Sequence, residues 1–454
     1  MWKSRRILKL EKSLFAPLKE HGLTNLKLRY DWKTGYTRLF AGRLWEPDLD
    51  FSKYNQDFYS ESLLTDHALY YNDAQVRELY HRHSLTDYLE SVFELMRLGK
   101  HFGIDCYYSD KFNIRFIGNL HSRVLGINNR RHATLAGGIR RHSFKDSELD
   151  VIRDGLNLSR AMTYKNIAAE IPYGGCKTTI HMDEVDLENM EMLGFLAYCL
   201  DSLRCMTGPD MGFPTKLADV MNDHFSSQFT GGPHGPLGQT GSPTAYGTYL
   251  AMKQAVKFMK GTEALDGISI AVQGLGSVGW AMCEYLLREN VKLFVTDTDQ
   301  AIVERLLSVY PERSIEAVAP DRILFIRADI LCPCAVGGII REENIKDFHF
   351  KMIFGAANNQ LNAFSNSEEI RLAKLLAEKG ILYQEAWWHN TGGVLCGAEE
   401  YENGPKASID NLERKIERIV PQKTWQNLTV AKELGLTPTE SMYLTCEKQL
   451  FGTN

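Results

Sequence analysis

The spacing of apolar residues divides the chain into two halves that predict different architectures. Before about residue 240, segments with helical spacing alternate irregularly with short apolar runs typical of strands. Ser84 precedes the first helical segment and is a candidate N-cap for it. The first half is therefore expected to be α+β. Helices are predicted at residues 84–98, 150–170 and 187–203, and strands are predicted at 106–118, at 122–127 and on both sides of a turn at 33–35 within 26–40.

The second half follows a stricter pattern, in which apolar strands and helices alternate one by one. This alternation predicts a parallel sheet with helices on both of its faces, so the chain is assigned to the α/β class. The segment between the halves, residues 229–243, is dense in glycine and proline and marks the domain junction. Strands are predicted at residues 267–273, 291–297 and 322–326, and helices at 280–290 and 300–310.

Composition narrows the class of protein. A chain of 454 residues with 44% hydrophobic content exceeds what one core usually supports, so two domains are expected. The formal charge of -5, from 52 basic and 57 acidic residues, gives no positive field that would favour nucleic acid. The nine cysteines lie mostly in apolar runs, as reduced core thiols do. Since no apolar stretch predicts a signal peptide or a membrane span, a soluble, cytoplasmic protein is expected.

A dinucleotide-binding motif opens the second half. Gly274, Gly276 and Gly279 follow a predicted strand and begin a predicted helix, which is the context that a G-x-G-x-x-G motif requires. Asp297 ends the next strand, where a carboxylate can bind the adenosine ribose and repel a 2′-phosphate. The alternative is that the glycines only shape a loop. Strand, helix and acid together favour a bound cofactor, and NAD over NADP.

Two lysines are candidates for catalysis. Lys165 lies on a predicted helix, and Lys177 follows Gly174, Gly175 and Cys176 in what the glycines predict to be a turn. The alternative is that both are solvated surface lysines, where most lysines are found. Because glycine removes side-chain bulk, a substrate and a nicotinamide ring could both approach the Lys177 ammonium.

Ten sequence blocks between about residues 136 and 400 give this chain a close resemblance to the glutamate, leucine, phenylalanine and valine dehydrogenase family. The similarity is greatest to its leucine and phenylalanine branch. In chain order the blocks are AGGIR, MTYKNIAAE, YGGCK, GPDMG, SPTAYG, GLGSVG, VTDTD, CPCAVGG, GAANNQL and NTGGVLCGAEE.

This resemblance implies a domain organisation. It implies a substrate domain that supplies the oligomer contacts, a Rossmann-type domain that closes on it, and a C-terminal segment that returns to the first domain. We expect an N-terminal extension of unassigned role at 1–75, a substrate-binding and oligomerisation domain at 76–240, a Rossmann NAD-binding domain at 241–405 and a C-terminal helical segment at 406–454.

The resemblance also implies an activity: NAD-dependent oxidative deamination of an apolar L-amino acid to the 2-oxo acid and ammonia, and the reverse reductive amination, by a homo-oligomer. Lys177 would activate water and Asp210 would move protons at the amino group. Lys165 would hold the substrate carboxylate. Two ammonium groups in a closed cleft depress each other's pKa, and Asp210 would oppose that shift. The other expected substrate contacts are Gly138, Met162, Asn359 and Val394, and the other cofactor contacts are Ser277, Val278, Thr244 and Asn359.

The side-chain pocket is expected to be apolar and wide. Glutamate dehydrogenases carry a lysine at the position of Ala136, and a glutamate side chain without that cation would be an unpaired anion. Ala136, Gly208 and Gly397 are smaller than their counterparts in the leucine enzymes, which favours a bulky aliphatic or aromatic substrate. The alternative is that Trp387 and Trp388 refill the space.

Several positions depart from the family pattern or lie outside its blocks. Cys176 replaces a glycine and Phe213 replaces a threonine, which leaves open low or redirected activity, or a non-catalytic NAD-binding sensor. A thiol beside a lysine also suggests an oxidation site at Cys176, with a packing role as the alternative. Cys332-Pro333-Cys334 has no matching pair of ligands, so no metal is expected. His81 and His83 are most simply solvated.

Overall fold

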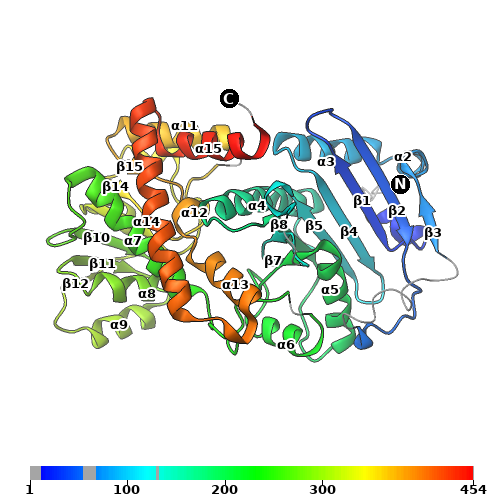
Figure 1. The fold of residues 1–454 in the computed structure, drawn as a ribbon, viewed down its shortest axis with the longest axis horizontal. Helices are drawn as coiled ribbons and strands as arrows, with labels where there is room; N and C mark the ends of the chain where they lie inside the picture. Colours follow the sequence, from blue (N-terminus) through cyan, green and yellow to red (C-terminus); the bar gives the residue numbers. More distant parts are fainter. Residues whose placement is uncertain (1–11, 55–67, 129–131, 227, 364, 453–454) are drawn as a thin grey trace, which may run out of the picture. The chain divides into compact units, whose positions relative to one another are not determined.

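The computed structural model describes residues 12–54, 68–128, 132–226, 228–363 and 365–452 (Figure 1). These residues form two compact units. Unit 1 comprises residues up to 123 with 135–160 and 175–229, and unit 2 comprises 124–134, 161–174 and the chain from 230 onward. The four domains expected from the sequence remain a prediction. We describe each unit by itself.

The described part of unit 1 is built on a nine-stranded mixed sheet, with strand order β3-β2-β1-β4-β5-β8-β6-β9 and β7 paired with β8. The predicted pair of strands at 26–40 is confirmed as an antiparallel hairpin in which Tyr30 lies opposite Thr37. Residues from the first 75 thus extend this sheet. The strands are β1 (Asn25–Tyr30), β2 (Thr37–Arg43), β3 (Leu69–Tyr71), β4 (Gly103–Ser109), β5 (Ile114–Leu120), β6 (Leu135–Ala136), β7 (Ile139–His142), β8 (Gly174–His181) and β9 (Cys205–Met206).

Helices cover the two faces of this sheet. Because neighbouring residues of a strand point to opposite faces, Phe116 and Ile117 of β5 enter different cores. Phe116 packs in the core that contains the apolar helix α5, and Ile117 packs in the core of α2, α3 and the start of α4. The helices are α1 (Ala16–Glu20), α2 (Asp73–Arg82), α3 (Thr86–Leu98), α4 (Glu148–Ala168), α5 (Met190–Leu203) and α6 (Lys216–His224), with a 3₁₀ turn at Phe51–Lys53.

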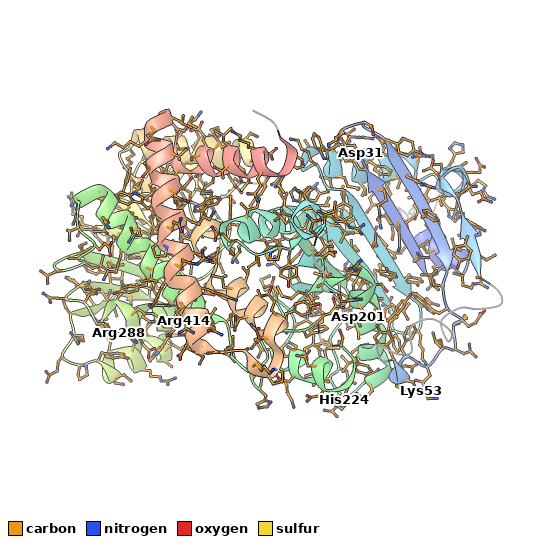
Figure 2. All side chains as sticks on the ribbon, viewed as in Figure 1. Asp31, Lys53, Asp201, His224, Arg288 and Arg414 are labelled. Atoms are coloured by element: carbon orange, nitrogen blue, oxygen red, sulfur yellow. The ribbon has the colours of Figure 1, made fainter. Side chains whose placement is uncertain are left out.

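A buried carboxylate on α5 joins distant segments of unit 1. Asp201, labelled in Figure 2, is 2% exposed. It accepts hydrogen bonds from the Tyr54 hydroxyl, at 2.7 Å, from the Ser226 hydroxyl and from the Gln228 amide. A buried charge requires such partners, because unpaired it would lose its hydration without compensation.

Three expectations about local structure are wrong. Ser84 does not cap the helix that follows it: α3 begins after Leu85, and Ser84 lies in the left-handed region (φ 56°) at the end of α2. The predicted strand at 122–127 holds a 3₁₀ turn at Val124–Gly126, and the predicted strand at 322–326 holds one at Ile323–Phe325. Short apolar runs have too few residues for their period to separate a strand from a turn of helix.

The described part of unit 2 contains a six-stranded, all-parallel sheet of order β12-β11-β10-β13-β14-β15, which confirms the α/β assignment. The strands are β10 (Ser269–Gln273), β11 (Lys292–Thr296), β12 (Ile315–Ala317), β13 (Ile330–Pro333), β14 (Met352–Ile353) and β15 (Leu382–Tyr383). The helices are α7 (Gly241–Lys260), α8 (Ser277–Leu286), α9 (Gln300–Val309), α10 (Glu342–Ile345), α11 (Asn366–Glu378), α12 (Ala386–His389), α13 (Gly392–Asn403), α14 (Ile409–Leu434) and α15 (Pro438–Phe451), with a 3₁₀ turn at Gly404–Lys406.

The C-terminal helices complete unit 2. Helix α14 packs along α7, and α15 contributes Met442, Tyr443 and Cys446 to an aromatic core. That core also contains Tyr164 from the second half of α4, a segment that the sequence placed in the first domain. The described residues include no helix with both the length and the apolar composition needed to cross a bilayer.

Candidate active site and dinucleotide site

Lys177 lies in the middle of β8 in unit 1, so the glycine turn predicted around it is wrong. The strand is buried at every position, and Lys177 pairs in register with Asn119 of β5. The Lys177 side chain is 7% exposed, which excludes the alternative of a solvated surface lysine. Alternation along the strand sends Cys176 to the opposite face, where it is fully buried in the α5 core. Cys176 therefore packs in that core.

Asp210 faces Lys177 from the turn after β9. The Asp210 N–H donates to the Ile139 carbonyl, at 2.9 Å, which attaches this turn to β7. Its carboxylate oxygen Oδ2 forms an ion pair with the Lys177 ammonium and a second one, at 3.2 Å, with Arg140. Burial alone would raise the pKa of Asp210, but the charges of Lys177 and Arg140 outweigh it and lower that pKa well below its usual range. Asp210 is therefore a carboxylate at neutral pH.

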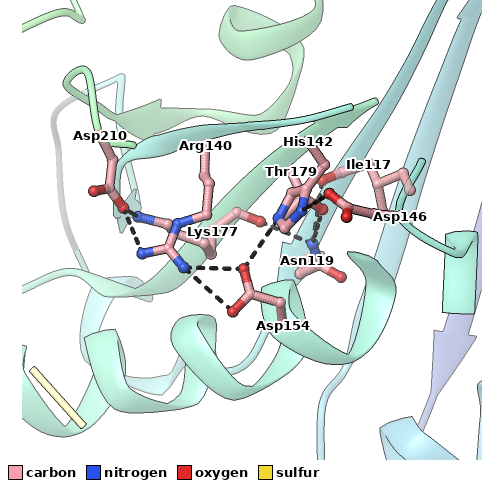
Figure 3. Close-up of polar contacts among 9 residues, drawn as sticks. All are labelled: Ile117, Asn119, Arg140, His142, Asp146, Asp154, Lys177, Thr179 and Asp210. Carbon is pink, nitrogen blue, oxygen red and sulfur yellow. Dashed lines mark hydrogen bonds and ion pairs between the residues drawn. The ribbon is translucent and has the colours of Figure 1, made fainter. Parts of the chain in front are cut away.

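Acidic and basic side chains alternate along the contacts that continue from this pair (Figure 3). Arg140 also binds both oxygens of Asp154 on α4, at 3.1 and 3.3 Å. Asp154 in turn contacts Nε2 of His142, at 3.2 Å, and the other ring nitrogen of His142 contacts Asp146. Burial disfavours the His142 imidazolium, but the two carboxylates favour it more, so the pKa of His142 is raised. Lys177, Asp210 and Arg140 thus form one end of a chain of ionic contacts.

Arg140, His142 and Asp154 were not expected from the sequence. A partial signal was present, because Arg140 and His142 are two residues apart and so share one face of β7. Asp154 and Gly155 lie on the first half of α4. A Cβ on Gly155 would lie 2.0 Å from the Asn119 amide nitrogen, so glycine at 155 permits the close approach of α4 to the sheet.

Gly138 lies close to the Lys177 ammonium. A Cβ at this position would lie 3.3 Å from Lys177 Nζ, 3.0 Å from the Gly208 carbonyl oxygen and 3.5 Å from the Asp210 Cβ. The structure therefore brings together four of the expected residues: Gly138, Lys177, Gly208 and Asp210. The glycine beside the Lys177 ammonium belongs to the AGGIR block and not to the pair at 174–175.

The remaining substrate positions have varied surroundings. Ala136 is buried in β6, opposite Met206 of β9. In unit 2, a Cβ on Gly397 would lie 2.9 Å from the Thr230 hydroxyl, so Thr230 occupies the space beside that glycine. The rings of Trp387 and Trp388 pack with each other in the aromatic core, and Trp387 also contacts Tyr164 and Tyr443.

Lys165 and Met162 lie in the part of α4 that belongs to unit 2. Burial, assisted by the Lys165 charge, lowers the pKa of His389 to about 4, so this histidine is neutral at physiological pH.

Asn359 has φ 50°, a conformation that non-glycine residues rarely adopt and that is often found at functional sites. Val394 lies in the first turn of α13.

The dinucleotide motif has the geometry that a pyrophosphate requires. Gly274 follows β10 with φ 92°, in the left-handed region. A Cβ on Gly279 would lie 1.9 Å from the Gly274 carbonyl oxygen, so glycine at 279 permits this tight turn. An ideal Cβ on Gly276, before the first turn of α8, would have no described atom within 4 Å, which leaves space at the helix N-terminus. The motif therefore fits a bound dinucleotide.

The Asp297 side chain contacts the backbone of the Gly274–Gly279 turn. Its carboxylate accepts hydrogen bonds from the backbone N–H groups of Leu275, at 2.6 Å, and Asp299, at 2.9 Å. Although burial raises the pKa of Asp297, these bonds lower it overall, so the residue carries a negative charge at neutral pH.

The other expected cofactor residues lie where two helices begin. Ser277 and Val278 start α8, and a Cβ on Gly241, the first residue of α7, would lie 2.9 Å from the Ser277 Cβ. Thr244 lies one turn further along α7 and donates to the Thr240 carbonyl, at 2.8 Å.

The cysteines of the Cys332-Pro333-Cys334 segment lie beside the same turn. Their Sγ atoms are 3.7 Å apart, and a Cβ on Gly279 would lie 3.3 Å from the Cys334 Cβ. The hydrogen bond from Cys332 lowers the pKa of the Cys334 thiol.

Comparisons with known proteins agree with this geometry. The dimerisation domain of the Glu/Leu/Phe/Val dehydrogenases matches residues 125–226, and the Glutamate/Leucine/Phenylalanine/Valine dehydrogenase domain matches residues 296–445. The leucine dehydrogenase of Thermoactinomyces intermedius is 38% identical over 269 residues, which cover 58% of this chain and 70% of that protein. The phenylalanine dehydrogenase of Lysinibacillus sphaericus is 34% identical over 339 residues, which cover 72% and 85%.

A solved structure is similar along most of its length. The crystal structure of L-tryptophan dehydrogenase from Nostoc punctiforme matches with a TM-score of 0.65 and 28% identity, over 79% of this chain and 98% of that one. Two family domains, relatives above 30% identity and the two-unit α/β fold lead to one conclusion. The chain belongs to the Glu/Leu/Phe/Val dehydrogenase family and is an amino acid dehydrogenase, an oxidoreductase that depends on a nicotinamide nucleotide.

Proposed function

We propose that this protein catalyses NAD-dependent oxidative deamination of a bulky apolar L-amino acid, and the reverse reductive amination. One observation carries the proposal: a buried lysine, a shared carboxylate and a glycine meet at one place, as Lys177, Asp210 and Gly138. A buried lysine paired with an acid, beside a glycine, is an arrangement suited to proton transfer.

The reaction removes a hydride from Cα and adds water to the carbon left behind. NAD, when bound, accepts the hydride. Asp210, held as a carboxylate, accepts a proton from the substrate amino group. Lys177 assists attack of water on the iminium carbon, and the resulting carbinolamine releases ammonia to leave the 2-oxo acid. One amino acid, one water and NAD give one 2-oxo acid, ammonium, NADH and a proton.

The proposed substrate side chain is large and apolar. Ala136 offers a buried methyl group where a cation would be needed to bind a glutamate side chain. Trp387 and Trp388 pack among aromatic residues of unit 2. Thr230 beside Gly397 limits the width at that position. Relatives named for leucine, phenylalanine and tryptophan define the range of side chains to examine.

The function is tested by following NADH formation at alkaline pH with a panel of L-amino acids, including leucine, phenylalanine, tryptophan and glutamate. NAD binding is measured separately by calorimetry. Turnover with the apolar members and none with glutamate is the expected result. NAD binding without turnover of any amino acid would instead assign the protein to the sensor class.

Replacing Asp297 with asparagine is expected to lower the preference for NAD over NADP at least about tenfold. The amide keeps an acceptor for the Leu275 N–H but removes the charge that would repel a 2′-phosphate. Charge-assisted hydrogen bonds contribute about 1.5–3 kcal/mol, which corresponds to at least a tenfold change. The kcat/KM values for the two cofactors measure the effect.

Asp299→Asn is the matched control. Asp299 is two residues from Asp297, and its side chain caps α9 by accepting a hydrogen bond from the Ala301 N–H. An unchanged NAD preference in Asp297→Asn would contradict the assigned role.

Replacing Gly138 with alanine is expected to reduce kcat/KM for the amino acid about tenfold or more without changing NAD affinity. The added methyl group would lie 3.3 Å from Lys177 Nζ, in the space proposed for the substrate. Gly137→Ala is the contrast: its Cβ would lie 1.6 Å from the Cys176 carbonyl oxygen, so loss of the fold is expected. Circular dichroism and steady-state kinetics separate the two results. Full activity in Gly138→Ala would show that the substrate binds elsewhere.

A further inference from the structure

Two helices of unit 1 that are far apart in sequence end in the same way, each at a histidine. His21 follows α1 and His83 follows α2. In both cases the next residue is left-handed, Gly22 with φ 59° and Ser84 with φ 56°. In both cases the residue after that donates its N–H back into the helix: Leu23 to Leu18, at 2.8 Å, and Leu85 to Tyr80, at 2.9 Å. This shared helix end fixes the backbone of both histidines.

The two imidazoles converge. Their Nε2 atoms are 3.2 Å apart, and the rings meet edge to face at 77°. Glu20, the last residue of α1, places a carboxylate oxygen 3.6 Å from Nδ1 of His83. One ligand atom from each of the three residues lies within 4.8 Å of the others, which distinguishes this group among the residues that the structure describes. His83 was expected to be solvated, yet its side chain is only 17% exposed.

We propose that Glu20, His21 and His83 bind a divalent transition-metal ion of the zinc class. Two Zn–N bonds of about 2.0–2.1 Å at a tetrahedral angle place the nitrogens about 3.3–3.4 Å apart, close to the 3.2 Å found here. Imidazole and carboxylate are ligands suited to zinc, nickel and copper. The partial negative charge at the C-terminus of α2 adds a favourable field for a cation.

Glu20 can act in either of two positions. In its present position, 3.6 Å from Nδ1 of His83, its carboxylate does not contact the two Nε2 atoms, and its negative charge favours a cation between them. With a change of rotamer it can provide a third ligand, because its side chain is 70% exposed. Water completes the coordination. Without a metal, the same 3.2 Å separation accommodates one hydrogen bond between the rings, so the site folds in both states.

Such an ion would join helices α1 and α2, whose histidines are 62 residues apart. Its role would be to hold α1 against α2 within unit 1. It would not take part in catalysis, because Lys177, Asp210 and Arg140 belong to a different set of contacts. This inference therefore goes beyond the proposed function and does not depend on it. A ligand that binds the folded chain raises the apparent Tm.

The experiment uses the full chain, stripped with chelator and titrated with Zn²⁺ by calorimetry at about pH 7.5, where histidines are mostly neutral. We expect one Zn²⁺ per chain in the parent. We expect at least about tenfold weaker binding in His21→Ala and in His83→Ala, and about tenfold weaker binding in Glu20→Gln. His81→Ala is the matched control: this histidine lies two residues from His83, is exposed and should bind Zn²⁺ as the parent does.

Thermal unfolding provides the second measurement. At the same Zn²⁺ concentration, Zn²⁺ should raise the Tm of the parent and of His81→Ala more than the Tm of His21→Ala and His83→Ala. The proposal is overturned if the parent binds no Zn²⁺, or if the affinity is kept in both His21→Ala and His83→Ala. The parent titration alone can overturn it, so a poorly folded variant would not leave it untested.

Discussion

Replacement of Lys177 by alanine is expected to lower turnover of the amino acid by about 10²–10⁴-fold, the range typical of a lost general acid or base. NAD affinity should change much less than turnover, because Lys177 is not among the residues expected to bind the dinucleotide. The measurement is NADH formation at saturating NAD and amino acid, with NAD affinity determined separately. Both numbers are needed, since a lost cofactor site would also abolish NADH formation.

A second substitution separates catalysis from structure. Lys177→Arg keeps a cation that can pair with Asp210, but a guanidinium does not give up its proton in the accessible pH range. We expect this variant to be as inactive as Lys177→Ala and to retain most of the parent's stability. Substantial turnover in Lys177→Arg would show that the site needs only a positive charge at position 177, and would remove Lys177 from the role of base.

The dinucleotide site could be predicted from sequence because its parts are local. Gly274, Gly276 and Gly279 lie within six residues, and the strand and helix around them have clear periods. The short apolar run at 322–326, which was predicted to be a strand, has no glycine motif or clear period around it. The strand beside β10 is formed instead by Ile330–Pro333, and the choice between two nearby apolar runs depends on packing that the local pattern does not contain.

The ionic contacts around Lys177 could be predicted only in part. Lys177 was a candidate from its local sequence, but Asp210 came only from the resemblance, since 33 residues separate the two and the spacing implies no contact. Arg140 and His142 reach Asp154 because β7 pairs in parallel with β8, under α4. That pairing is a property of the whole sheet.

The glycines around Lys177 also have roles that the local sequence does not predict. The pair at 174–175 was interpreted as a turn that exposes Lys177, but these residues begin a fully buried strand. The requirement for glycine lies on the neighbouring segment. Gly137 approaches the Cys176 carbonyl and Gly138 approaches the Lys177 ammonium. A glycine signals close approach of backbone, and the sequence does not say which atoms approach.

Asp210→Asn is expected to lower turnover at least about 100-fold and to destabilise the protein. In the parent, one carboxylate oxygen is shared by Lys177 and Arg140. The amide has nearly the same shape and no charge, so two cations would face each other with no anion between them. The Asp210 side chain is 35% exposed, so the loss in free energy of unfolding should lie between about 1 kcal/mol for an exposed pair and about 3–5 kcal/mol for a buried one.

The pH dependence of this loss identifies its cause. The folded-state pKa of Asp210 is depressed, so its contribution to stability is fully present above the unfolded-state pKa of about 3.9 and is lost as the pH falls towards the folded value. The stability difference between parent and Asp210→Asn should therefore be constant near neutral pH and shrink below about pH 4. Urea unfolding at several pH values measures it. A difference that stays constant in acid would point to lost packing rather than lost charge.

Asp154→Asn distinguishes the proposed chemistry from a purely structural role. That variant breaks the contacts of Asp154 with Arg140 and His142 but leaves the Lys177–Asp210 pair in place. We expect it to lose stability by a similar amount and to retain much more turnover than Asp210→Asn. If turnover instead falls equally in both variants, the whole chain of ionic contacts acts as one unit. If it falls only in Asp210→Asn, the carboxylate beside Lys177 is the one that moves the proton.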